Sequence, residues 1–367
     1  GSEWNNPPVS HISYHLSSVA AGLYFAGMSV IKIYYGLEKR RRKITKLTDF
    51  LPNGTSACKG IHSVPLQPLN LLTMSAFKAY DFRGVFGIDF TLEDVFRIGF
   101  YLPSLLQTQS VLVGRDVRHS SPALFEALAR GINSAGADVI DLGVCTTPMV
   151  YWATARNGFR ASVMITASHN PPEYNGMKIS GENALPVGYD NGLSDLENRI
   201  KQPPVVVEHP GKIIPLALHD EYLTFLRESG KYDFSGLKLV IDCGNGMAGL
   251  FAQKLFGPNV LYLFENPDGS FPNHDPNPLE EKNLEELKYV VRENKADLGV
   301  VFDGDADRVM FVDENGAFIS PDLMIAALAH YYAPEGKLEE KVLQEFRTSQ
   351  SVSADLTAME ADVHIWR

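Results

Sequence analysis

"ASVMITASHNPPEYNGMK", residues 161–178, decides how this chain is read. Its first residues form a short apolar run that is typical of a buried strand. The run ends at Ser168, and the polar loop that follows carries an imidazole at His169 and an ammonium at Lys178. Ligand groups in open α/β sheets lie at the carboxyl ends of strands. The stretch therefore predicts a functional loop at the edge of a sheet.

Strand-like and helix-like segments alternate on both sides of this stretch. Strands are expected at 110–116, 137–144 and 161–168, and helices between them at 121–136 and 147–156. In the first of these helices, we expect Ser121 to cap the start and Gly136 to mark the end. The cycle restarts later, with helices expected at 220–229, 284–295 and 321–334, a strand, turn and helix at 237–256, and strands at 259–264 and within 296–308. This order predicts an α/β fold with parallel strand pairs.

The chain divides into four predicted segments. Residues 1–73 lack the α/β pattern and are expected to be an N-terminal extension, disordered or non-native, with Met74 as a plausible natural start. Residues 74–235 would form a first domain with the serine loop, and 236–320 a second domain with an acidic loop. Residues 321–367 would begin a third domain and leave it incomplete. We therefore expect consecutive α/β domains with mixed, mostly parallel sheets.

The charge and the cysteine content of the chain exclude some classes of function and favour others. A formal net charge of −11 argues against non-specific nucleic-acid binding. Three widely spaced cysteines without a CxxC motif favour a reducing, cytoplasmic setting. The apolar run at 17–36, followed by basic residues, could be a membrane anchor, but Lys32 interrupts it and its length is at the lower limit for spanning. We interpret it as part of the extension and expect no membrane association. Oligomeric state is left open.

An acidic loop, "DGDADR" at 303–308, follows the apolar run "LGVVF". Its carboxylates, at Asp303, Asp305 and Asp307, would repel one another without a cation, and their hard oxygen ligands select Mg²⁺ or Ca²⁺. A calcium-binding EF-hand is disfavoured, because its sixth position requires glycine and here is Arg308, and because the flanking segments are strand-like. "DENG" at 313–316 is expected to be a hairpin turn. The loop thus predicts a Mg²⁺ site at the end of a strand.

Ser168 itself does not resemble a hydrolase nucleophile. The GxSxG elbow is absent, and His169 is adjacent in sequence, a position from which a base rarely reaches its nucleophile. A phosphoserine is favoured, with the acidic loop supplying a metal to offset its charge. Lys178 could serve as acid or base towards a hydroxyl if its surroundings lowered its pKa.

Several motifs together resemble those of the α-D-phosphohexomutases, the family of the phosphomannomutase/phosphoglucomutases. "TASHNP" (166–171) with "YNGMK" (174–178) is similar to the family's phosphoserine loop, and "DGDADR" to its metal loop. The other similar segments are "KAYDFRGVFG" (78–87), "GRDVRHSSP" (114–122) and "DCGNGMAG" (242–249).

The resemblance implies roles for particular residues. Ser168 would carry the phosphoryl group and, through its phosphate, would bind Mg²⁺ together with the three aspartates of the acidic loop. Lys178, His169, Arg83 and Arg308 would act in catalysis, with Lys178 in proton transfer. The residues implied at the substrate cleft are Tyr80, Asn170 and Arg118. The implied reaction converts a hexose 6-phosphate into the 1-phosphate, of mannose or glucose, through glucose or mannose 1,6-bisphosphate as intermediate and activator.

The chain also departs from the family's pattern. The family's sugar-binding loop in a third domain and phosphate-binding loop in a fourth were not found, although "FRTSQSV" (346–352) resembles the early third domain. We therefore expect these residues alone to be poorly active, because remote binding energy positions a substrate for reaction. Two alternatives stay open: a Mg²⁺-dependent phosphatase-like enzyme in which Asp303 forms the covalent phosphate, and an inactive truncated paralogue that acts as a binding module.

Overall fold

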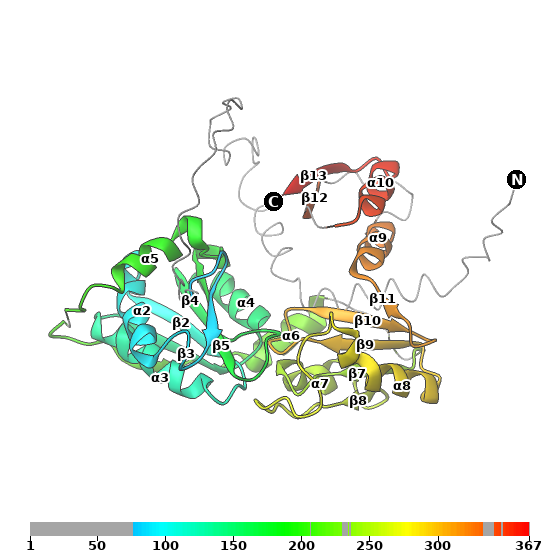
Figure 1. Cartoon of the computed structure of the whole chain (residues 1–367), viewed down its shortest axis with the longest axis horizontal. Helices are drawn as coiled ribbons and strands as arrows, with labels where there is room; N and C mark the ends of the chain where they lie inside the picture. The colour runs from blue at the N-terminus through cyan, green and yellow to red at the C-terminus, as the bar shows by residue number, and fades with distance from the viewer. Residues whose placement is uncertain are drawn as a thin grey trace, which may run out of the picture.

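The computed structural model describes residues 76–205, 207–229, 234, 236–332, 341–345 and 348–366. Along these residues, a first sheet with its helices is followed by a second, and a smaller strand–helix unit comes last (Figure 1). The expected extension at 1–73, the apolar run at 17–36 and the start at Met74 lie outside the described residues.

The first sheet has six strands in the order β1-β5-β4-β2-β3-β6. Strand β5 runs antiparallel to its neighbours β1 and β4, whereas β4, β2, β3 and β6 are parallel to one another. The strands are β1 (Phe82–Val85), β2 (Ser110–Arg115), β3 (Asp138–Val144), β4 (Ala161–Ile165), β5 (Tyr174–Gly181) and β6 (Ile213–Pro215).

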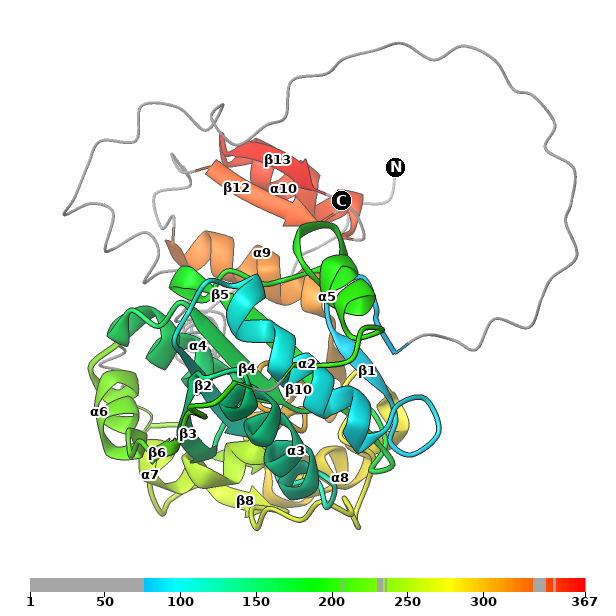
Figure 2. The ribbon, with the colours of Figure 1, turned by 90° about the vertical axis from the view of Figure 1, so that its left-hand side faces the viewer.

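Helices cover both faces of the first sheet (Figure 2). Alternate residues of β2 serve the two faces: Val111 and Val113 belong to the core with α2 and α3, and Leu112 to the core with α4 and α6. A strand buried on both sides reads as a continuous apolar run for this reason. The helical elements are α2 (Leu92–Leu105), α3 (Ser121–Ser134), α4 (Thr147–Asn157), η2 (Glu182–Ala184), η3 (Tyr189–Asn191), α5 (Leu193–Arg199) and α6 (His219–Ser229).

The second sheet has five strands in the order β11-β10-β9-β7-β8, with β9, β7 and β8 parallel and β10 and β11 antiparallel to their neighbours. Its core on one face includes Met247, Ala252 and Leu328, and α8 packs on the other face through Leu287 and Val291. The elements are β7 (Leu239–Asp242), η4 (Met247–Leu250), α7 (Ala252–Phe256), β8 (Leu261–Leu263), η5 (Glu281–Leu284), α8 (Glu285–Asn294), β9 (Leu298–Phe302), β10 (Val309–Asp313) and β11 (Phe318–Ile319).

The last unit is a parallel pair of strands, β12 (Lys341–Glu345) and β13 (Asp362–Trp366), with α9 (Pro321–Tyr332) and α10 (Gln350–Ala358). Val352, Leu356 and Met359 of α10 and its end form a small core with Ala329 of α9. Helix α9 also contributes Leu328 to the core of the second sheet, so it connects the last unit to that sheet.

The fold class predicted from the sequence is confirmed, since both sheets are mixed, mostly parallel and covered by helices. The hairpin turn at 313–316 is confirmed by the Gly316 amide, which donates to the Asp313 carbonyl at 3.0 Å. Each described sheet lies within one predicted segment, but the boundaries of the segments stay predictions. Among the described residues, no helix has both the length and the apolar character needed to cross a membrane.

Two local expectations were wrong. Ser121 does not cap α3: the N-cap is Ser120, while Ser121 is buried and donates its hydroxyl to Asp116 at 2.6 Å. The segment after Pro172 is not all loop, because residues 174–181 form β5. The polar and glycine residues of this segment do not form the apolar pattern that is typical of a strand. The segment is a strand because it pairs with β1 and β4.

Candidate active site

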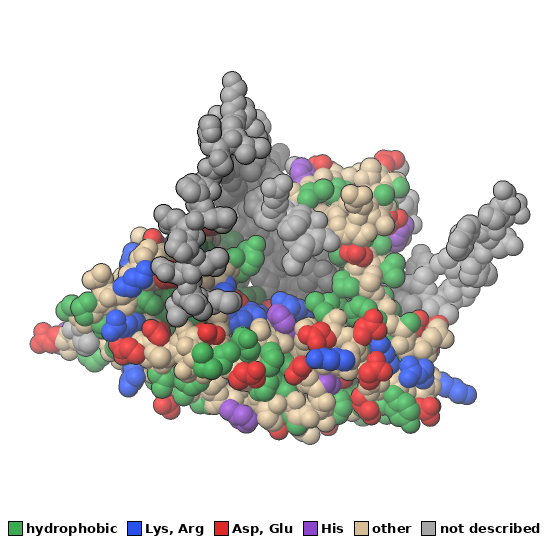
Figure 3. All heavy atoms as spheres, in the orientation of Figure 1, with side chains coloured by type: hydrophobic (Ala, Val, Ile, Leu, Met, Phe, Trp, Pro, Cys, Tyr) green, Lys and Arg blue, Asp and Glu red, His purple; other side chains and the backbone are tan. Residues whose placement is uncertain are grey.

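The serine loop, residues 166–173 between β4 and β5, meets the acidic loop, residues 303–308 between β9 and β10. Each loop begins at the carboxyl end of a parallel strand, and the Ser168 hydroxyl donates to Asp303 Oδ2 at 2.8 Å across 135 positions of sequence. In Figure 3, basic side chains and a histidine are visible together near the middle of the molecule. The juxtaposition on which the sequence interpretation depends is therefore present.

Ser168 has an unusual backbone conformation. Its φ of 54° is in the left-handed region, which costs an L-residue roughly 1 kcal/mol. The Ser168 amide donates to Thr166 Oγ1 at 2.8 Å, and the Asn170 amide donates to the Ala167 carbonyl at 3.1 Å. The side chain is fully buried. A tight local turn thus aims the hydroxyl at the acidic loop.

The three aspartates of the acidic loop have donor oxygens within 4.8 Å of one another, an arrangement that could hold a metal ion. Asp303 Oδ1 accepts the Asp307 and Arg308 amides, both at 3.1 Å, so the loop's own backbone fixes this carboxylate. Asp305 Oδ1 and Asp307 Oδ1 are buried and accept no hydrogen bond from the described part of the chain. Buried carboxylate oxygens without donors fit a hard cation such as Mg²⁺.

The carboxylates differ in electrostatic environment. Burial and the charges of Asp305 and Asp307 raise the pKa of Asp303. Burial also opposes ionisation of Asp305, but Lys178 and the Thr147 hydroxyl outweigh it and hold the pKa of Asp305 below its usual range. The pKa values of these two neighbouring carboxyl groups are therefore shifted in opposite directions.

Lys178 reaches the acidic loop because β5 lies antiparallel beside β4, with Lys178 opposite Met164. Its ammonium donates to Asp305 Oδ2 at 2.6 Å and to Asp307 Oδ2. Burial disfavours the ammonium, but the two carboxylates outweigh burial and raise the pKa of Lys178. The lowered pKa that the sequence analysis made a condition for acid–base work is thus contradicted by these contacts, because the lysine is ion-paired rather than isolated.

His169 and Arg308 lie side by side at the mouth of the site. Arg308 Nη1 donates to His169 Nδ1 at 2.9 Å, and that nitrogen lies 3.4 Å from Ser168 Oγ. Burial, together with the charges of Arg308 and Arg83, lowers the pKa of His169 to about 4. His169 is therefore a neutral imidazole near pH 7, with Nδ1 as an acceptor.

Arg83, on β1, supports the serine loop, of which Asn170 is a part. Arg83 Nη1 donates to the Ala167 carbonyl at 3.2 Å and to Asn170 Oδ1 at 2.8 Å, and Nη2 pairs with Asp81. Tyr80, three residues before Arg83, has 80% of its surface exposed, so it is open to a ligand. The structure brings Arg83 to the loop that contains Asn170 and leaves Tyr80 exposed on the surface.

Arg118 departs from the sequence-based expectation that it lines the cleft. The residue is completely buried, with a relative exposure of 0%, and its donors bind backbone carbonyls of the serine loop and its neighbours. Its long basic side chain gave no sign of this, because burial of an arginine depends on partners distant in sequence. Arg118 cannot contact a substrate in this arrangement.

Thr147 is a site residue that the sequence analysis missed. Its amide donates to the Asp305 carbonyl at 3.0 Å and its hydroxyl to Asp305 Oδ2, so the first turn of α4 holds a carboxylate of the second unit. The available signal was its position three residues after the end of β3, at the same sheet edge as Ser168.

Gly304 allows the two loops to approach. A Cβ at this position would lie 2.5 Å from the Ser168 carbonyl oxygen, which is closer than real side chains approach backbone. We expect Gly304→Ala to separate the loops and to reduce phosphoryl transfer by about 100-fold, since small displacements of reacting groups have effects of that size. Stopped-flow or quench kinetics would measure the rate of phosphoryl transfer. Gly181→Ala is the matched control, because its nearest neighbour would be at 3.9 Å, and unchanged kinetics of Gly304→Ala would contradict the expectation.

His274, which is partly buried, pairs with the buried Asp242 at the end of β7. His274 Nε2 lies 3.2 Å from Asp242 Oδ2, and Nδ1 lies 2.8 Å from the Asp275 carbonyl oxygen. Both ring nitrogens face acceptors, and only the imidazolium can donate from both. Burial disfavours the charge, but these acceptors outweigh burial and raise the pKa of His274.

Stability should therefore depend on the charge of His274. Because the folded-state pKa is above the unfolded value near 6.5, the contribution is full below about pH 6.5 and is lost as pH rises through the folded pKa. We expect His274→Gln to lower Tm by about 2–4 °C at pH 6 and by less at pH 9, as followed by circular dichroism. His330→Gln, which removes an exposed His–Asp pair, is the control. An equal change at both pH values would contradict the assignment.

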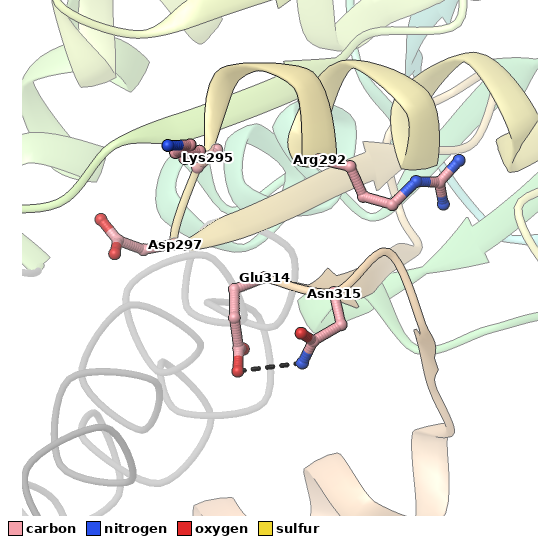
Figure 4. Close-up of a pocket in the computed structure, with 6 residues that line it drawn as sticks. Arg292, Lys295, Asp297, Glu314 and Asn315 are labelled. Carbon is pink, nitrogen blue, oxygen red and sulfur yellow. Dashed lines mark hydrogen bonds between the residues drawn. The ribbon is translucent and has the colours of Figure 1, made fainter.

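A shallow depression lies away from these loops, between the end of α8 and the β10–β11 turn (Figure 4). Its volume is about 420 Å³, and Arg292, Lys295, Asp297, Glu314 and Asn315 line it. Its charges are mixed, and none of its lining residues belongs to the serine loop or the acidic loop.

Comparisons with known proteins show which family the chain resembles. Residues 74–203 match the family model described as phosphoglucomutase/phosphomannomutase, alpha/beta/alpha domain I, and residues 220–316 match domain II of the same family. A protein named phosphohexose mutases from Xanthomonas campestris pv. campestris is 38% identical over 268 residues, covering 70% of this chain and 59% of the relative. A phosphomannomutase from Salmonella montevideo is 36% identical over 297 residues, covering 78% of this chain and 65% of the relative.

A solved structure agrees with the sequence comparisons. The crystal structure of a phosphoglucomutase/phosphomannomutase family protein from Burkholderia thailandensis superposes with a TM-score of 0.72 at 30% identity and covers 80% of this chain and 66% of that one. Fold and site together define a multidomain α/β protein with the groups that phosphoryl transfer uses. The chain belongs to the phosphoglucomutase/phosphomannomutase family, as its motifs indicated. It spans about three fifths of the length of the curated relatives cited.

Proposed function

We propose that this chain carries the phosphoryl-transfer centre of a mutase that interconverts hexose 6-phosphates and hexose 1-phosphates. The observation that carries the proposal is the 2.8 Å hydrogen bond between Ser168 Oγ and Asp303 within a cluster of buried carboxylates. The names of the relatives, phosphohexose mutase and phosphomannomutase, support a hexose phosphate of mannose or glucose as substrate.

In the proposed reaction, Ser168 carries a phosphoryl group on Oγ. The Oγ–P bond breaks as a sugar hydroxyl oxygen forms a new bond to phosphorus, and the product is the 1,6-bisphosphate. The sugar reorients, its other phosphate returns to Ser168 Oγ, and the second monophosphate leaves. Lys178, an ammonium in the structure, would give a proton to Ser168 Oγ as its bond to phosphorus breaks and would regain one from the attacking sugar hydroxyl. The neutral His169 lies next to Ser168 Oγ, and Arg308 donates to His169. Arg83 holds the loop through Asn170, and the exposed Tyr80 would contact the sugar phosphate.

Asp303, Asp305 and Asp307 would hold Mg²⁺ together with the serine phosphate, and the ion would offset negative charge on the transferring group. The donor set fits, because it consists of carboxylate oxygens and two of them are buried without a hydrogen-bond donor in the described residues. A reducing, cytoplasmic setting belongs to the same proposal, and Cys145 and Cys243 are free, buried thiols.

Geometry favours Ser168 over Asp303 as the phosphorylated residue. Asp303 Oδ1 accepts two backbone amides, and Oδ2 accepts the Ser168 hydroxyl, so this carboxylate is fixed in place rather than free to attack phosphorus. A phosphatase-like mechanism with a phosphoaspartate would require breaking these contacts.

Phosphate mapping tests the proposal. The chain would be incubated with Mg²⁺ and glucose 1,6-bisphosphate or mannose 1,6-bisphosphate, and the modified residue would be located by mass spectrometry. We expect phosphate on Ser168 and its transfer to added hexose 1-phosphate. Phosphate on Asp303 would replace the proposal by the phosphatase-like alternative, and no phosphorylation with either donor would favour the non-enzymatic one.

A further inference from the structure

We propose that Arg118 is the positioning residue of the site: its guanidinium holds the backbone of the serine loop so that Ser168 Oγ faces Asp303. The inference rests on the proposed function, and it goes beyond the cleft-lining role that the sequence suggested. It starts from the contrast between the complete burial of Arg118 and its charged side chain in the polar loop that follows β2.

All the N–H donors of the Arg118 side chain are engaged. Nη2 donates to the carbonyls of Ser168 at 3.0 Å and Asn170 at 2.6 Å. Nη1 donates to the carbonyls of Pro171 at 2.6 Å and Tyr174 at 3.1 Å. One planar group thus bonds carbonyls along the whole loop, from its serine to the first residue of β5. A buried charge is tolerated where it is paired and fully hydrogen-bonded.

The guanidinium is itself fixed from behind. Asp116 Oδ2 accepts its Nε at 3.1 Å, and Asp116 Oδ1 accepts the Arg118 amide at 3.1 Å and the Ser121 hydroxyl at 2.6 Å. This explains why Ser121 is buried rather than capping α3. Only arginine presents donors in a rigid fork of this shape, whereas lysine offers a single ammonium.

The second unit covers the same guanidinium. The ring of Phe271, from the segment between β8 and η5, lies 5.0 Å from Arg118 Cζ. A Cβ at Gly269 would collide with the backbone of Val117 and Arg118, so that segment is packed closely against the strand end. Arg118 therefore contacts both the loop that carries Ser168 and the unit that carries Asp303.

Such a clamp is needed because the loop stores strain. Ser168 has a φ of 54°, and conformations of this kind persist only where surrounding contacts impose them. Without the four carbonyl contacts, Ser168 could relax towards a β or α conformation, which would turn Oγ away from Asp303. The expected loss is in the rate of transfer and not in the affinity for sugar phosphate, since Arg118 is buried beneath the loop.

The experiment compares Arg118→Lys with Arg115→Lys in the full chain. Arg115, the last residue of β2, pairs with Asp141 at 2.7 Å, and among the described residues its side chain makes no hydrogen bond or ion pair with the serine loop. Two measurements are made: single-turnover transfer from phosphorylated Ser168 to hexose 1-phosphate over a range of sugar phosphate concentrations, and amide hydrogen exchange of peptides covering 166–175 and 110–115. For Arg118→Lys we expect transfer at saturation to fall about 100-fold, the half-saturating concentration to stay within roughly threefold, and exchange to accelerate in 166–175 alone. Arg115→Lys should match the unmodified chain.

Wild-type transfer and exchange in a folded Arg118→Lys protein would overturn the inference. If Arg118→Lys does not fold, as judged by circular dichroism, Phe271→Leu replaces it, because it loosens one side of the guanidinium without removing a charge. About tenfold slower transfer and faster exchange in 166–175 would then support the clamp, and wild-type values would overturn it. If the unmodified chain shows no transfer at all, the proposed function fails, while the exchange comparison still decides on the clamp.

Discussion

Ser168→Ala is expected to abolish phosphorylation of the chain and to reduce phosphoryl transfer by at least roughly 10³-fold. The hydroxyl is the only part of the residue removed, and in the structure it is the group that meets Asp303. Because the phosphoserine is an obligatory carrier in the proposed reaction, no weaker contact can replace it. Intact-mass spectrometry after incubation with a hexose 1,6-bisphosphate would measure phosphorylation, and an isotope-labelled donor would measure transfer.

Ser162→Ala is the matched control for this change. Ser162 lies on β4, the strand that leads to Ser168, and its buried hydroxyl has no hydrogen-bond partner among the described residues. Removing a buried hydroxyl that makes no bond should leave stability unchanged or slightly higher and should not affect transfer. A Ser168→Ala protein that still acquires phosphate and passes it to a sugar phosphate would remove Ser168 from the mechanism.

Asp305→Asn is expected to have the second-largest effect. The substitution keeps the size of the side chain but removes the charge of a proposed Mg²⁺ ligand whose Oδ1 has no hydrogen-bond donor in the described chain. We expect transfer to fall by about 10³-fold, since removing one element of charge stabilisation at a reacting phosphoryl group has effects of this order. Raising the Mg²⁺ concentration should restore transfer only to the extent that it offsets weaker Mg²⁺ binding.

Metal binding can be measured without any activity. Saturating Mg²⁺ should stabilise the unmodified chain by about 2.7 kcal/mol at a hundredfold excess over Kd, seen as a rise in Tm, and chelation should reverse it. Asp305→Asn should lose most of this rise. Asp297→Asn is the control, because Asp297 lies just before β9, at the opposite end of that strand, and accepts the Lys238 amide. An equal Mg²⁺-dependent shift in Asp305→Asn would exclude Asp305 from the site.

The locations of the two loops could be predicted from the sequence because they depend on local pattern. A buried strand has to be a short apolar run, and the first polar residues after it mark its end. Ser168 follows β4 and Asp303 follows β9 for this reason. The chemical types, a hydroxyl in one loop and carboxylates at alternate positions in the other, are equally visible without coordinates.

What each polar side chain does could not be predicted in the same way. Three arginines of the same residue type have different roles in the structure. Arg118 is a buried clamp, Arg83 supports the serine loop, and Arg308 donates to His169. Burial of a charged group is decided by the partners that meet it, and these come from other elements. The family resemblance correctly placed Arg118 near the serine loop, but it wrongly placed the side chain at the cleft surface rather than buried beneath the loop.

The amino-acid order by itself determined an α/β chain with a serine and a carboxylate cluster at strand ends, because strand burial and ligand chemistry are properties of neighbouring residues. Tertiary structure alone decided that these groups meet, that Lys178 arrives on an antiparallel β5 as an ion-paired ammonium, and that Thr147 holds Asp305. The physical reason is that such contacts join residues more than a hundred positions apart, and their geometry follows from how the two sheets pack rather than from any local period.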